Sequence, residues 1–274
     1  MRFADLHVHT CFSDGTFSPQ RIVEEALTAG LSCISITDHD NISGIAPAML
    51  AAGERLEIVS GIELTAELTG SEIHILGYLI DFTDEAFLGM LKEMQEVRIR
   101  RIHSICQKLT RLKMPVEPEE IFRLAGEGSV GRLHVARVLV HKGYVANTGE
   151  AFSRFIGDKG PAYVAKFKMP PKEAIAWIRR VGGIPVLAHP YLLPQKFLIE
   201  DFVKAGIMGI EALYTEHSDF QQSEYVKLAE KFGLLVTGGS DCHGEAKQEA
   251  KIGRVRLPYE YVERLKEAKC RLGS

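Results

Sequence analysis

The chain has 274 residues, of which 46% are hydrophobic and 25% charged, and its formal net charge is −3. This composition supports a real core and argues against a protein that holds long duplex nucleic acid through a global positive field. A small anionic substrate stays compatible with it, because bound divalent cations reverse the local sign of charge. The five cysteines lack framework spacing, and the chain has no apolar signal core and no run that could span a bilayer. We therefore expect a soluble cytoplasmic protein with no membrane partner.

The first third of the sequence alternates strand and helix signals. Ser18 and Pro19 are typical of a helix start, and Gly30 is typical of a helix end. Alternation of strand and helix indicates parallel strands with helical crossovers, so that side chains at successive strand ends meet on one face, as in a β/α barrel. Strands are predicted at 3–8, 31–36, 56–62 and 72–78, and helices at 20–28 and from 43 to about 52.

The pattern changes near residue 83. A long amphipathic helix is predicted at 84–113, followed by shorter helices at 118–125, 132–141 and 148–155. We interpret 84–158 as an inserted, all-helical cap subdomain, because a barrel tolerates insertions in the loops of its C-terminal face. The barrel domain is then expected to comprise 1–83 and 159–274. Its second part is predicted to have helices at 171–180, 199–205, 219–232 and 259–272 and strands at 184–188, 209–213 and 234–237.

Histidines and acidic residues form short clusters where the predicted strands end. A His-x-His pair on a strand places both rings on the same side, and neutral imidazole with carboxylate is a donor set for divalent metals. Taken singly, such a histidine is usually a core or surface residue, and Asp-x-His is often only a turn. The joint pattern favours a multinuclear metal site. The residues of these clusters are His7, His9, Asp14, Asp38, His39, Asp40, Glu63, His74, His189, Asp241 and His243.

Four of these segments, at 7–9, 37–40, 189–190 and 240–243, resemble the signature motifs of the PHP (polymerase and histidinol phosphatase) family, in complete order. The resemblance implies an α/β fold, a distorted (β/α)7 barrel, with up to three metals and phosphoesterase activity. It implies that the first metal is held by His7, His9, Glu63 and Asp241, the second by Glu63, His74 and His189, and the third by Asp14, His39 and His243. Cys242 stands where many members carry alanine, and we expect a packed residue there rather than a ligand.

The implied metals define the expected chemistry. Two to three divalent ions, with Mn favoured and Fe or Zn also suited, would share a hydroxide that attacks phosphorus, and they would neutralise the phosphoryl oxygens. Glu63 is expected to bridge two of the cations. Asp38 or Asp40 is expected to orient His39 or to move protons, although Asp40 is equally suited to capping a helix. The candidate catalytic residues are therefore Asp38, His39, Asp40 and Glu63.

The cap subdomain and the return to the barrel supply candidates for substrate binding. Arg132 and His134 stand at a predicted helix start, where backbone N–H groups and a guanidinium suit a phosphate, and a solvated helix face is the alternative. Lys159 lies between glycines, and His217 follows a strand. These stretches resemble the PHP subgroup that removes the 3′-phosphate from nucleoside 3′,5′-bisphosphates, with relatives that trim RNA from the 5′ end. In that subgroup the insertion caps the site and cationic residues hold the 5′-phosphate. Leu133 replaces the usual proline.

We therefore expect a metal-dependent phosphoesterase acting on a small anionic nucleotide or a short oligonucleotide. One alternative is a histidinol-phosphate phosphatase, which the helical insertion disfavours. The other is a non-catalytic metal-binding module, which the complete set of nine ligands disfavours. Arg98, Arg100 and Arg101 are expected on a solvated face, unless they line a groove and guide an oligonucleotide. The sequence does not decide the metal, the oligomeric state or the length of the substrate.

Overall fold

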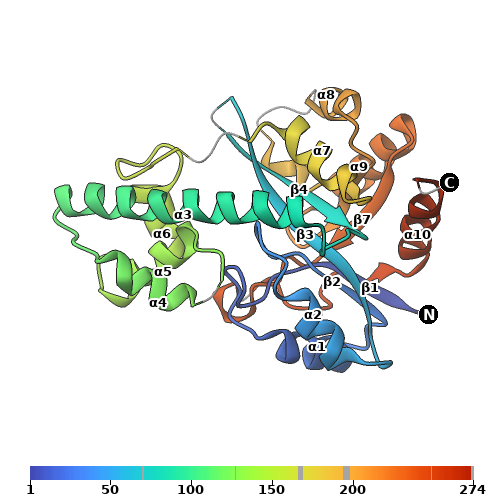
Figure 1. The fold of residues 1–274 in the computed structure, drawn as a ribbon, viewed down its shortest axis with the longest axis horizontal. Coiled ribbons are helices and arrows are strands. Elements are labelled where there is room, and N and C mark those ends of the chain that lie inside the picture. Colours follow the sequence, from blue (N-terminus) through green and yellow to red (C-terminus); the bar gives the residue numbers. More distant parts are fainter. Residues whose placement is uncertain (70, 127, 166–168, 194–197, 248, 273–274) are drawn as a thin grey trace.

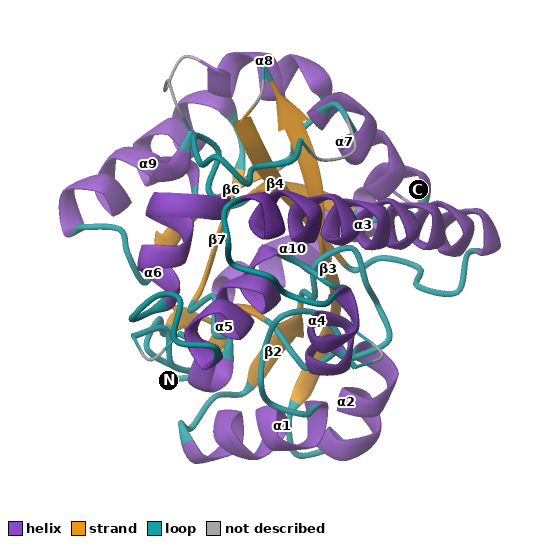
Figure 2. Ribbon diagram, turned by 90° about the vertical axis from the view of Figure 1, so that its left-hand side faces the viewer, coloured by secondary structure: helices purple, strands orange, loops and turns teal. Residues whose placement is uncertain are grey.

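One strongly curved sheet forms the centre of the fold (Figures 1 and 2). The structure is a computed structural model that describes all residues except 70, 127, 166–168, 194–197, 248 and 273–274. The strand order is β7-β6-β5-β4-β3-β2-β1-β8. The strands are β1 (Phe3–Val8), β2 (Cys33–Ile36), β3 (Glu57–Leu68), β4 (Ser71–Tyr78), β5 (Ile184–Leu187), β6 (Gly209–Tyr214), β7 (Leu235–Gly239) and β8 (Leu257–Pro258).

The sheet closes almost completely into a barrel. The chain that leaves β7 returns to the end of β1, where the Asp241 amide donates to the His7 carbonyl at 2.8 Å and the His9 amide donates to the Cys242 carbonyl at 2.9 Å. Strand β8 pairs with the beginning of β1 and was not predicted, because it has only two residues. The predicted barrel is thus confirmed, with a short eighth strand added to it.

The prediction of uniformly parallel strands is wrong for β4. This strand runs antiparallel to both β3 and β5, whereas β1, β2 and β3 are parallel, as are β5, β6 and β7. The reason is the connection, because only residues 69 and 70 separate β3 from β4 and a parallel pair needs a crossover of a dozen or more residues. Strand β3 also continues past its predicted end, so Glu63 lies within a strand rather than after one.

Helices cover the outside of the barrel. In both ribbon views α1 and α2 lie on one side of the strands and α7, α8 and α9 on the opposite side. The Ser18 side chain caps α1 by accepting from the Arg21 amide at 3.3 Å, with Pro19 in the first turn, as predicted. These helices are α1 (Pro19–Thr28), α2 (Ile45–Ala52), α7 (Pro171–Arg180), α8 (Leu198–Ala205), α9 (Asp219–Phe232) and α10 (Glu260–Leu272).

Only helical elements occur in the described residues between β4 and α7. They are α3 (Glu85–Arg111), α4 (Pro118–Ala125), α5 (Arg132–His141), α6 (Thr148–Ala151) and a π-helical turn, Phe152–Ile156. Figure 1 shows α3 extending away from the sheet, with the shorter helices alongside its far half. Phe87 and Leu91 near the start of α3 belong to the barrel core, whereas Ile105 and Leu109 belong to a separate core made of residues 102–162. Helix α3 therefore joins two cores, and the boundaries at 84 and 158 stay a prediction.

Among the helices that the structure describes, none combines the length and the apolarity that crossing a membrane requires.

Candidate metal centre and active site

The nine predicted ligands meet at one end of the barrel. Most of them follow parallel strands or lie near their C-terminal ends, as the sequence predicts. His74 reaches the same end for a different reason. It lies in the first half of an antiparallel strand, opposite Thr65 of β3, so the start of β4 faces the site.

The first group of ligand atoms lies at the end of β1. The Nε2 atoms of His7 and His9 are 3.1 Å apart, because alternate residues of a strand share a face. Oε2 of Glu63 lies 3.3 Å from His7 Nε2 and 3.2 Å from His9 Nε2. Oδ1 of Asp241 lies 3.4 and 3.1 Å from the same two nitrogens. Four side chains thus direct one donor atom each toward a single point.

The second group uses the other oxygen of Glu63. Its Oε1 lies 2.9 Å from His74 Nδ1 and 3.1 Å from His189 Nε2, and these two nitrogens are 3.3 Å apart. Glu63 therefore belongs to both groups and could bridge two cations.

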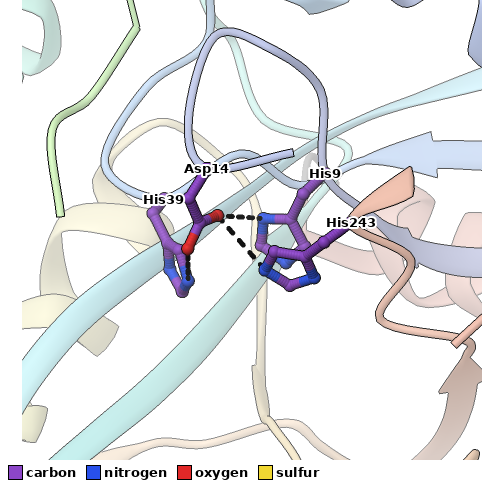
Figure 3. Close-up of side chains that lie close together, drawn as sticks. All are labelled: His9, Asp14, His39 and His243. Atoms are coloured by element: carbon purple, nitrogen blue, oxygen red, sulfur yellow. Dashed lines mark ion pairs between the residues drawn. The ribbon is translucent and has the colours of Figure 1, made fainter. Parts of the chain in front are cut away.

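The third group surrounds Asp14 (Figure 3). Asp14 Oδ1 lies 3.2 Å from His243 Nε2 and 3.9 Å from His9 Nδ1, and Asp14 Oδ2 lies 3.9 Å from His39 Nε2. The other nitrogen of His39 lies 3.1 Å from Glu63 Oε2. His39 therefore lies between the third group and Glu63. The donor atoms of the third group are the most widely spaced of the three, at up to 3.9 Å.

These spacings fit divalent cations. Two donors on one ion with bonds of about 2.0–2.2 Å lie about 3 Å apart, which is the separation found in the first two groups. Among the described residues, three buried atoms at the centre have no hydrogen-bond partner, namely Asp14 Oδ1, His39 Nδ1 and Glu63 Oε2. Buried polar atoms are normally paired, so these atoms point to a ligand that they would hold. Imidazole and carboxylate donors suit Mn, Fe and Zn.

The charges of the centre keep its carboxylates ionised. Burial raises the pKa of Glu63, but the charges of His39, His74 and His7 outweigh this effect, so the pKa lies well below its usual range. Burial also lowers the pKa of His9, but the neighbouring carboxylates of Asp241 and Glu63 outweigh burial and raise it to about 9. A divalent cation at this position would displace the proton that His9 otherwise carries.

A second layer of carboxylates orients the histidines, and the sequence reading missed it. Glu211 is fully buried; it accepts from His7 Nδ1 at 2.9 Å and from the His189 amide at 2.8 Å. Glu72 Oε1 lies 2.7 Å from His74 Nε2. The contacts with the His7 and His74 rings place a ring N–H away from the centre, so the second nitrogen faces it, whereas the contact with His189 holds its backbone. The signal for Glu211 was present in the sequence, as an acidic residue inside the apolar strand β6.

Asp241 is held in a comparable way. Its Oδ2 accepts from the Tyr214 hydroxyl at 2.8 Å and from Lys247 Nζ at 2.6 Å, which leaves Oδ1 directed at His7 and His9.

Three of the site residues also have a left-handed backbone, with φ of 48° at Asp40, 24° at His189 and 54° at Asp241. Such strain in residues other than glycine concentrates at functional sites.

Asp38 and Asp40 both make structural contacts. Asp38 accepts from the amide and hydroxyl of Thr10 at 2.7 and 2.6 Å and from the Ser13 hydroxyl at 2.5 Å, so it holds the loop that carries Asp14. Asp40 accepts from the Thr65 amide at 2.7 Å and pairs with Arg98 of α3. Helix α2 is capped at Gly44, so Asp40 does not cap it. The hydrogen bonds of both carboxylates go to residues other than His39, and their catalytic roles stay a prediction.

A cavity of about 230 Å³ lies over the ligands. Arg132 lines it from α5, and its guanidinium pairs with Glu72 and Asp158 at 2.7 Å each; its contact with substrate stays a prediction. Arg98 and Lys247 line the cavity as well. Positive side chains therefore line the same cavity as the ligand groups.

The other three predicted substrate residues lie elsewhere. His134 is buried; its Nδ1 accepts from the Gly131 amide at 3.1 Å, and it lines a separate hollow beside the loop at 11–16. His217 is also buried, with Nδ1 2.9 Å from the Ala212 carbonyl oxygen. Lys159 is exposed. Among the described residues that line the cavity over the ligands, none of these three occurs, so their contact with substrate stays a prediction.

The expectation of a solvated face for the arginines of α3 is wrong for two of them. Arg100 is 68% exposed, whereas Arg98 is 11% and Arg101 is 7% exposed. Arg101 donates to the Val164 carbonyl at 2.8 Å, while its Nη2 has no partner among the described residues. Burial and the charges of Arg132 and Arg98 lower the pKa of Arg101 to about 10, although the charge of Glu72 opposes this. Arg98 and Arg132 therefore line the cavity, and Arg101 lies behind it, close enough to both for their charges to act on its pKa.

Known proteins share this sequence and this architecture. A family model described as PHP domain matches residues 5–125. A 5′-3′ exoribonuclease of Haemophilus influenzae is 35% identical over 87% of this chain and 89% of its own length. A 3′,5′-nucleoside bisphosphate phosphatase of Chromobacterium violaceum is 29% identical over 91% of this chain and 90% of its own length. A solved structure from Bifidobacterium adolescentis, described as a metal-dependent phosphoesterase, has a TM-score of 0.89 and 28% identity, and covers 96% of this chain and 95% of its own.

Proposed function

This chain belongs to the PHP family and is a hydrolase of phosphate esters, and on that premise we propose that it removes the 3′-phosphate from nucleoside 3′,5′-bisphosphates and trims short RNA from the 5′ end. One observation carries the proposal. The same cavity is lined by residues of the ligand groups and by Arg132, and Arg101 lies close behind Arg132. A substrate with two phosphates matches this combination of a candidate metal centre and a separate guanidinium.

We propose that the three ligand groups hold two to three divalent cations, with manganese favoured. His7, His9, Glu63 and Asp241 would hold the first cation, Glu63, His74 and His189 the second, and Asp14, His39 and His243 the third. When bound, such cations lower the pKa of coordinated water toward neutrality and neutralise phosphoryl oxygens.

The other residues of the cavity would bind and orient the substrate. Arg132 presents a planar fork that suits a phosphate, and the unpaired Nη2 of buried Arg101 adds to the positive field there. Leu133, Phe152 and Leu192 give the cavity apolar surface for a base. A volume of about 230 Å³ lies below the usual range for ligand pockets, which favours one nucleotide unit inside, with the rest of an RNA outside.

A substrate panel tests this proposal. The panel contains nucleoside 3′,5′-bisphosphate, nucleoside 5′-monophosphate, 5′-phosphorylated oligonucleotides and histidinol phosphate, each with Mn²⁺, and it is read by phosphate release and product mass. We expect turnover of the bisphosphate and of short RNA, and loss of both on chelation and in His39→Ala. Arg132→Gln should raise KM for the bisphosphate, whereas Arg100→Gln, which changes an exposed arginine, should leave it unchanged.

Three outcomes would contradict the proposal. Turnover of histidinol phosphate alone would assign the site to a different substrate. Metal loading without turnover of any phosphoester would indicate a binding module. Activity retained after both chelation and His39→Ala would refute the metal mechanism.

The cytoplasmic location and the limits of the cap subdomain also stay predictions.

A further inference from the structure

Glu72 lies between the second ligand group and the arginine that lines the cavity. It belongs to β4 and is separated from His74 by one residue, so both side chains lie on the same face of the strand. Its Oε1 lies 2.7 Å from His74 Nε2, and its Oε2 lies 2.7 Å from Arg132 Nη2. One carboxylate is therefore shared between a candidate metal ligand and a candidate substrate ligand.

The contact with His74 selects the nitrogen that faces the centre. When Nε2 donates to Glu72, the nitrogen left for a cation is Nδ1, which lies 2.9 Å from Glu63 Oε1 and 3.3 Å from His189 Nε2. A carboxylate behind a ligating histidine also raises the basicity of the ring. Glu72 is thus placed to strengthen cation binding at the second group.

The contact with Arg132 acts in the opposite direction. The guanidinium is 13% exposed, and its Nη1 donates to Asp158 Oδ1 at 2.7 Å. Glu72 therefore neutralises part of the charge that Arg132 presents to the cavity. A neutral imidazole becomes a stronger donor when its other nitrogen binds a cation, so a cation at the second group would draw the Glu72 charge toward His74 and away from Arg132.

We propose that Glu72 is a positioning residue that couples cation binding at the second group to the availability of Arg132 for an anion. His74, when it binds a cation, and Arg132 would compete for the one carboxylate of Glu72. With a cation bound, the positive charge of Arg132 would therefore be less neutralised. The identity of the anion, a distal phosphate of the substrate, rests on the proposed function, but the competition between cation and arginine does not.

A double-mutant cycle of Mn²⁺ binding tests this coupling by calorimetry, without substrate. The four proteins are the wild type, Glu72→Gln, Arg132→Gln and the double variant. Glu72→Gln should weaken Mn²⁺ binding at one site by about tenfold. Arg132→Gln should tighten it by at least about twofold, because Glu72 is released to His74. In the Glu72→Gln background, Arg132→Gln should have no effect.

Two controls and one further variant separate this mechanism from general effects. Arg100→Gln removes an exposed positive charge from α3 and should not change Mn²⁺ affinity. Asp158→Asn removes the other carboxylate on Arg132 without touching His74, so it should not weaken Mn²⁺ binding as Glu72→Gln does. Glu72→Asp keeps the charge but shortens the reach, and it should lose the coupling as well. Thermal unfolding of each variant checks that it is folded.

The result that overturns the proposal is an equal effect of Arg132→Gln in both backgrounds, because the arginine would then act on the cation through space. Unchanged Mn²⁺ affinity in Glu72→Gln would overturn it too. Failure of the proposed function would be seen separately, as absence of bisphosphate hydrolysis, and would leave the result of the metal cycle unchanged.

Discussion

Replacement of Glu211 by glutamine is the most informative change at the metal centre. The two carboxylate oxygens accept from two different donors, His7 Nδ1 at 2.9 Å and the His189 amide at 2.8 Å, and the side chain is fully buried. A glutamine has one acceptor oxygen and one N–H₂ group, so it can satisfy only one of these donors. Whichever way the amide turns, one of the two N–H donors loses its acceptor.

The magnitude follows from the two orientations. If the N–H₂ group faces the His189 amide, a buried donor is left unpaired, at a cost of about 1–3 kcal/mol in the free energy of unfolding. If it faces His7, it donates to Nδ1 and moves the ring proton to Nε2, the nitrogen that faces Glu63 and Asp241. Loss of such an orienting contact weakens metal binding by about 10- to 100-fold.

The assay combines urea unfolding of the metal-free protein with calorimetric titration of Mn²⁺. Glu216→Gln is the matched control, because Glu216 lines the same cavity but contacts Tyr191 rather than a candidate ligand. The reasoning would be refuted if Glu211→Gln kept its free energy of unfolding within about 0.5 kcal/mol of the wild type, the usual range for surface substitutions, and also kept its Mn²⁺ affinity.

Three further outcomes are expected. Lys247→Met should lower kcat/KM for the bisphosphate by about tenfold, since a charged hydrogen bond to Asp241 is lost while Tyr214 keeps its own; steady-state kinetics will show this. Burial lowers the pKa of His134 from 6.5 to about 4, so its contribution to stability is present above pH 6.5 and lost as the pH falls toward 4. In His134→Asn, the free energy of unfolding measured with urea should therefore change less with pH between 6.5 and 4. The same pH dependence as in the wild type would contradict this. Leu139→Ala, in the core of residues 102–162, should cost about 2–5 kcal/mol by the same assay.

Much of the barrel was predictable from the sequence because its strands and helices have clear periodicity and clear ends. Ser18 with Pro19 placed the start of α1, and the predicted bounds of α4, α5, α7 and α9 agree with the structure. The direction of β4 departs from the alternating pattern because the link at residues 69 and 70 is too short for the crossover that a parallel strand needs. The two-residue strand β8 has no periodicity to detect.

The candidate metal centre, like the fold, was predictable from the sequence only in part. Residue type and spacing predict which side chains converge, since His-x-His on a strand leaves little freedom. The partners behind them depend on tertiary packing. Glu211 and Glu72 look like ordinary acidic residues until the barrel brings them to His7 and His74. Arg101 was expected on a surface, and its burial follows from the packing of α3 against the segment around Val164, a contact between residues far apart in the sequence.

Hydrolysis of adenosine 3′,5′-bisphosphate in ¹⁸O-labelled water with Mn²⁺, followed by mass spectrometry of both products, tests the central claim most directly. Attack of water on the phosphorus of the 3′-phosphate predicts one ¹⁸O atom in the released inorganic phosphate and unlabelled adenosine 5′-monophosphate. Label in the nucleotide, release of the 5′-phosphate, or no Mn²⁺-dependent turnover would contradict the account.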